Sequence, residues 1–99
     1  MAHGEYKTPG GKLVQVDFTI VDDRIHQPVI SGDFFLYPDE ALEPMTNALD
    51  RLSVGINEEA IAEAVRLATP EGTDLIGTSP EGIAIAVRRA IMASEGRGR

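Results

Sequence analysis

The stretch Lys12-Leu13-Val14-Gln15-Val16-Asp17-Phe18-Thr19-Ile20-Val21 decides the fold class, because its side chains alternate between apolar and polar. Alternate positions of a strand point to opposite faces. One face therefore carries Val14, Val16, Phe18 and Ile20, and the other carries Gln15, Asp17 and Thr19. A two-residue period rich in β-branched side chains predicts a half-buried strand over 12–21.

Turn residues on both sides of this strand predict a small antiparallel sheet. Thr8-Pro9-Gly10-Gly11 is a turn, so we expect a short first strand over 5–8. Asp22-Asp23-Arg24 is a second tight connection, and a third strand is expected from Ile25 to Asp33. Pro28 cannot donate a backbone hydrogen bond, so we expect an edge position or a bulge there.

The second half of the chain predicts three helices. The first is indicated by apolar residues at helical spacing, with Asp39 as its expected N-cap: Leu42, Met45, Leu49 and Leu52. Asn57 is the expected cap of the second helix, and Ser79-Pro80-Glu81 is a strong start for the third. Between these two helices, we expect Leu75 and Ile76 to tuck under the sheet.

Strands come first and helices follow, which is the order of an α+β fold. We predict a three-stranded antiparallel sheet followed by about three helices packed on one face. The length of 99 residues suits one domain, expected over 1–94, with a disordered tail over 95–99.

Composition excludes several classes of function. The net charge of −7 argues against nucleic acid as a partner, because binding phosphates needs clustered Lys and Arg. The chain has no cysteine, which excludes disulfides and cysteine-ligated metals. No apolar stretch predicts a signal peptide or a membrane span, so we expect no membrane partner and a cytoplasmic location.

No constellation of residues predicts catalysis on this chain. His3 and His26 lack the spaced ligands of a metal site, and Thr8 to Lys12 lacks the spacing of a phosphate-binding loop. The acidic pairs fall at turns and helix starts, where carboxylates accept hydrogen bonds from backbone amides. We therefore predict no catalytic, metal-binding or cofactor-binding residues.

One segment at the junction of strands and helices is unusual, namely Ser31-Gly32-Asp33-Phe34-Phe35-Leu36-Tyr37-Pro38. Phe34 and Phe35 must point to opposite sides of an extended chain, so one ring can enter the core. The three aromatic rings are either a satellite core beneath the first helix or an anchor for another protein. For the second case the interface residues are Gly32, Asp33, Phe34, Phe35, Tyr37 and Pro38.

The run from Gly32 to Pro38, followed by an acidic helix start, resembles the C-terminal accessory domain of lipoate–protein ligases. The likeness extends over about 5–92 and includes the hairpin Lys7-Thr8-Pro9-Gly10-Gly11-Lys12-Leu13. In some archaea and bacteria this domain is a separate subunit. The resemblance implies a fold similar to that of iron–sulfur scaffold proteins, although this chain has none of the cysteines that those scaffolds use.

The resemblance implies a non-catalytic subunit of a two-component ligase. The large catalytic subunit would use ATP, magnesium and lipoate to form lipoyl-AMP, and would then lipoylate a lysine of a lipoyl domain. This chain would bind none of these cofactors, and its Phe35 or Tyr37 would contact the large subunit. Two alternatives remain open: a stand-alone protein-interaction module unrelated to lipoate, and a small enzyme in its own right.

Overall fold

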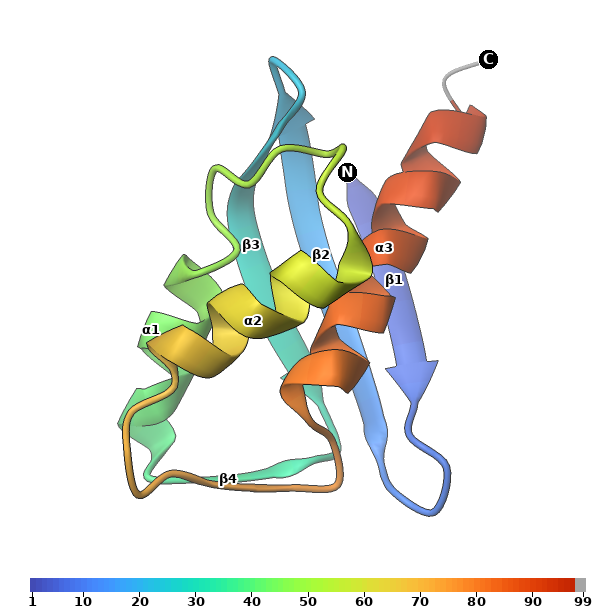
Figure 1. The fold of residues 1–99 in the computed structure, drawn as a ribbon. Helices are drawn as coiled ribbons and strands as arrows, with labels where there is room; N and C mark the ends of the chain where they lie inside the picture. Colours follow the sequence, from blue (N-terminus) through green and yellow to red (C-terminus); the bar gives the residue numbers. More distant parts are fainter. Residues whose placement is uncertain (98–99) are drawn as a thin grey trace.

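The computed structural model describes residues 1–97 and has the predicted α+β architecture (Figure 1). These residues form a three-stranded sheet, a two-stranded sheet, three α-helices and a 3-10 helix. The elements are β1 Ala2–Lys7, β2 Leu13–Val21, β3 Arg24–Gly32, β4 Phe35–Tyr37, the 3-10 helix η1 Asp39–Ala41, α1 Leu42–Asn47, α2 Glu58–Ala68, β5 Asp74–Ile76 and α3 Pro80–Arg97.

The first three strands form an antiparallel sheet in the order β1-β2-β3, as predicted. Strand β1 begins at Ala2, three residues before the predicted start. Strand β3 is an edge strand, and its pairing with β2 shifts between Asp17 and Thr19. This shift lies opposite Gln27 and Pro28, so the prediction of an edge position or bulge at Pro28 is confirmed on both counts.

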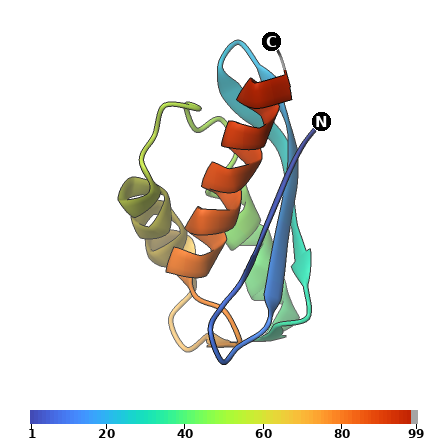
Figure 2. The ribbon, with the colours of Figure 1, turned by 90° about the vertical axis from the view of Figure 1, so that its right-hand side faces the viewer.

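The helices cover one side of this sheet, as Figure 2 shows. The predicted inner face of β2 is confirmed, because Val14, Val16 and Phe18 are fully buried. The third helix presents a stripe of buried apolar side chains to them: Ile83, Ala86, Val87, Ala90 and Ile91. Close packing of β1 on α3 requires glycine at position 4, since an added β-carbon there would lie 2.1 Å from the Ala86 carbonyl oxygen.

The predicted caps of α2 and α3 are confirmed. The Ala60 amide donates to Asn57 Oδ1 over 2.8 Å, and the Gly82 amide donates to Ser79 Oγ over 3.1 Å. Helix α3 continues to Arg97, beyond the start of the predicted tail at Glu95. The last two residues of that tail, 98–99, lie outside the described residues.

The first predicted helix is much shorter than expected. After η1, α1 ends at Asn47, and Asp39 makes no capping hydrogen bond, so its predicted role was wrong. Leu49 is nevertheless fully buried, because successive turns fold the chain back onto β3. The Arg51 amide donates to the Ile25 carbonyl over 2.6 Å, and the Ile25 amide donates to the Leu52 carbonyl over 2.9 Å. Beyond Asn47, the helical spacing of Leu49 and Leu52 therefore belongs to a series of turns and not to a helix.

Candidate functional site

The junction segment leaves the large sheet at a position that only glycine can occupy. Gly32 ends β3 with a φ of 146°, and an added β-carbon would lie 2.2 Å from the Leu13 carbonyl oxygen. The Asp33 amide donates to that same oxygen over 3.0 Å. Gly32 and Asp33 are therefore explained by the exit of the chain from the sheet.

Beyond this exit, β4 pairs antiparallel with β5 in a second, two-stranded sheet that the sequence analysis missed. Phe35 lies opposite Ile76, Leu36 opposite Leu75, and Tyr37 opposite Asp74. Leu36 and Leu75 pack against the main core. Because neighbouring residues of a strand point to opposite faces, the side chains beside them point outward.

The outward side chains form an exposed apolar patch, which we define as Phe35, Tyr37 and Ile76. Their exposed fractions are 56%, 63% and 60%, respectively. Phe35 and Ile76 are direct cross-strand partners, and Tyr37 follows Phe35 on the same face. Exposed clusters of large apolar side chains commonly mark sites of protein interaction.

The pairing of β4 with β5 shows which of the two phenylalanine rings belongs to the core. Phe34 is half-buried and packs against the main core, so it is structural. Pro38 is also half-buried, and its peptide bond with Tyr37 is cis. Of the six predicted interface residues, the structure thus brings Phe35 and Tyr37 together on one exposed face.

Ile76 belongs to the patch but was not among the predicted interface residues. The expectation that Ile76 tucks under the sheet was wrong, although its neighbour Leu75 is partly buried. The two apolar residues between polar loop segments could have indicated a short strand. Its pairing with β4 depends on chain segments far apart in sequence.

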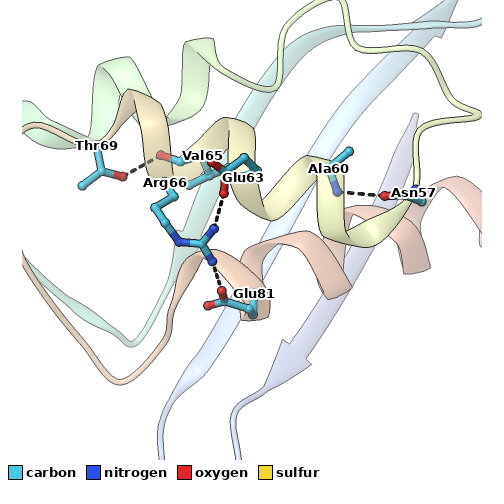
Figure 3. Close-up of polar contacts among 7 residues, drawn as sticks. All are labelled: Asn57, Ala60, Glu63, Val65, Arg66, Thr69 and Glu81. Atoms are coloured by element: carbon cyan, nitrogen blue, oxygen red, sulfur yellow. Dashed lines mark hydrogen bonds and ion pairs between the residues drawn. The ribbon is translucent and has the colours of Figure 1, made fainter.

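A hollow of about 720 Å³ lies elsewhere, between α2 and the start of α3. Four carboxylates and one guanidinium line it, namely Glu58, Glu59, Glu63, Glu81 and Arg66. Arg66 Nη1 pairs with Glu63 over 2.5 Å and Arg66 Nη2 pairs with Glu81, so these side chains tie α2 to α3 (Figure 3). The excess of carboxylates disfavours anionic ligands such as ATP or lipoate in this hollow.

The outer face of the large sheet carries a small polar cluster. His3 Nε2 contacts Glu5 over 2.9 Å, and His3 Nδ1 contacts Asp17 over 2.6 Å. Hydrogen bonds with Glu5 and then Asp17 raise the pKa of His3 above its ordinary value. These three side chains do not converge on one point, and residues 1–97 contain no group of three or more His, Cys, Asp or Glu that could hold a metal ion.

Comparison with solved structures gives one informative similarity. The chain is similar to a chain in the structure of a bipartite lipoate protein ligase and its E2 lipoyl domain from Thermoplasma acidophilum. The TM-score is 0.69 at 26% identity, and the match covers 89% of this chain and 96% of the other. No protein-family model matches the chain, and neither does any curated protein.

The match therefore extends over most of both chains. Within residues 1–97, no helix is long and apolar enough to cross a membrane.

Proposed function

We propose that this chain is the accessory subunit of a two-component lipoate–protein ligase. The observation that carries the proposal is the similarity to a chain in the structure of a bipartite lipoate protein ligase and its E2 lipoyl domain, over 89% of this chain and 96% of the other. The proposed role is to dock on a large catalytic subunit that activates lipoate with ATP and magnesium. The product, lipoyl-AMP, then lipoylates a lysine of a lipoyl domain.

The exposed patch supports a docking role. Leu36 and Leu75 supply the contacts of the small sheet with the core. Phe35, Tyr37 and Ile76 are exposed on its other face, so packing of the core does not account for them. Tyr and Phe are common at the centres of protein interfaces. We therefore assign the patch, and not the whole predicted set of six residues, to contact with the catalytic subunit.

A docked subunit also suits the chemistry of adenylation. Lipoyl-AMP is a reactive mixed anhydride, so its formation benefits from an active site closed to water. A second protein that packs beside the active site can order the loops that close it. In this scheme the accessory chain supplies surface and rigidity, and the catalytic subunit supplies the reacting groups and binds the cofactors.

Reconstitution tests this function. The large ligase subunit of the same organism would be incubated with lipoate, ATP and magnesium, with and without this chain, and lipoyl-AMP would be measured by mass spectrometry. We expect lipoyl-AMP only when both chains are present, and then lipoylation of an added apo lipoyl domain. Equal lipoyl-AMP formation without this chain would overturn the proposal.

The same reaction separates the proposed role from two others. If this chain were instead a lipoyl domain, one of its lysines, Lys7 or Lys12, would gain the acyl group and its mass would rise. For an accessory subunit, the intact mass should stay unchanged. A protein-interaction module unrelated to lipoate would not copurify with the large subunit. Copurification together with an unchanged mass is the result that we expect.

A further inference from the structure

The turn between β1 and β2 contacts the chain just beyond one end of the apolar patch. The turn between β1 and β2 is held on the residue after β5, because the Lys12 amide donates to the Gly77 carbonyl over 2.8 Å. Within the turn, the Gly11 amide donates to the Thr8 carbonyl over 2.7 Å. This turn and β4 lie at the same end of the molecule (Figure 1).

The stem of Lys12 lies directly over Gly77. An added β-carbon on Gly77 would lie 2.7 Å from Lys12 Cγ and 3.0 Å from Lys12 Cβ. Gly77 also has a φ of 96°, which favours glycine over any other residue. Gly77 directly follows Ile76 of the patch in the chain, so the stem of Lys12 packs on the residue next to the end of β5.

Lys12 is exposed and has no ion-pair partner among residues 1–97. This is notable in a chain with a net charge of −7. At the other end of β5, Asp74 lies opposite Tyr37 and is exposed. The patch thus has a carboxylate opposite Tyr37, and the residue after Ile76 lies under the stem of Lys12.

We propose that Lys12 and the apolar patch form one docking surface for the catalytic subunit, on which Lys12 pairs with a carboxylate of that subunit. This inference rests on the proposed function. Opposite charges at the two ends of the patch give the surface a direction, because only one orientation of the partner brings its carboxylate to Lys12 and keeps it from Asp74. The occupant is therefore a surface with an apolar centre and an acidic group at one end.

Charge reversal at Lys12 tests the pairing without disturbing the stem, because Glu keeps the β- and γ-carbons that lie over Gly77. The Kd for the large subunit would be measured calorimetrically, without ATP or lipoate, for the wild type, Lys12→Glu and Lys12→Arg. We expect Lys12→Glu to weaken binding about tenfold and Lys12→Arg to stay within about threefold of the wild type.

A matched control is Arg51→Glu, which makes the same charge change. Arg51 is highly exposed, and its amide bonds to Ile25 near the opposite end of β2, away from the patch. We expect less than about a twofold change in Kd, because exposed charges beyond the Debye length are screened. Equal weakening by both variants would overturn the inference and indicate a general charge effect.

Two further results would also overturn the pairing with a carboxylate. Wild-type affinity for Lys12→Glu would show that Lys12 lies outside the interface. Weakening that appears only when ATP is added would show that Lys12 meets a phosphate. If wild-type protein supports lipoyl-AMP formation in either case, the proposed function stands and this inference alone fails; if the wild type does not bind, the proposed function fails first.

Discussion

The two sheets of this molecule obey the same alternation but use it differently. In β2 the inner side chains Val14, Val16 and Phe18 are fully buried, and the outer residues between and beside them, Gln15, Asp17 and Thr19, are polar. In β4 and β5 the inner side chains are apolar, and so are Phe35 and Ile76 on the outer face. The difference separates side chains that the fold requires from side chains that a partner can use.

The largest expected effect lies in the covered sheet. Phe18→Ala removes a fully buried ring and should cost about 3–5 kcal/mol of unfolding free energy. That is a large fraction of the roughly 5–15 kcal/mol typical of small domains. Urea unfolding followed by circular dichroism measures it. A loss below about 1 kcal/mol would mean that the covered sheet is not the centre of the core.

Phe35→Ala, in the small sheet, should affect binding to the large subunit more than stability. Because the ring is 56% exposed, we expect a stability loss below about 1 kcal/mol. Binding to the large subunit should weaken by about 2 kcal/mol, roughly thirtyfold, as for an aromatic residue at an interface centre. Calorimetry with the large subunit and urea unfolding would be run on the same protein. Unchanged binding would assign Phe35 to the small sheet alone.

Loss of the cap of α2, one of the helices that cover the large sheet, should have an intermediate effect on the free energy of unfolding. Asn57→Ala removes the side-chain acceptor of the Ala60 amide at the start of α2, which should cost about 1 kcal/mol. Asn57→Ser retains a capping oxygen and is the matched control, with a loss of only a few tenths of a kcal/mol. Both values come from urea unfolding. Equal losses in the two variants would argue against the capping bond.

The smallest effect is expected on the outer face of the large sheet and depends on pH. Because the pKa of His3 is raised in the folded chain, its stabilisation is full below the unfolded pKa and is lost as pH rises through the folded pKa. His3→Ala should therefore cost less than about 1 kcal/mol near pH 5.5, because water screens this exposed pair. Near pH 8.5 the cost should be close to zero.

Urea unfolding at the two pH values measures this difference, and a proton NMR titration of the His3 ring checks the direction of its pKa. A cost that does not change with pH would mean that His3 contributes by packing and not by charge.

Much of the fold was readable from local patterns. The strand over 12–21 was predicted because alternation alone sorts its two faces, and the Asn57 and Ser79 caps were predicted because a cap needs only its own helix start. The first helix failed for the opposite reason. Leucines at helical spacing also suit a series of turns when hydrogen bonds to β3 replace those of a helix.

Only part of the candidate site could be predicted from the sequence. Phe35 and Tyr37 stood out because aromatic residues are scarce in this chain. Ile76 did not, because a three-residue strand has too few positions to show a period. The predicted absence of cofactor binding and the cytoplasmic location stay predictions, as does the likeness to iron–sulfur scaffold proteins.

Local patterns were enough to predict the α+β class, the inner face of β2 and the capped starts of α2 and α3, since each depends on neighbours a few residues away. It took the three-dimensional contacts to establish that Phe34 faces the core while Phe35 faces out, that Ile76 is exposed, and that Lys12 packs on Gly77. These outcomes depend on the pairing of β4 with β5 and on the hydrogen bond between Lys12 and Gly77, which connect segments far apart in the chain. No local pattern encodes such contacts, because the register of a strand pair is set by both strands together.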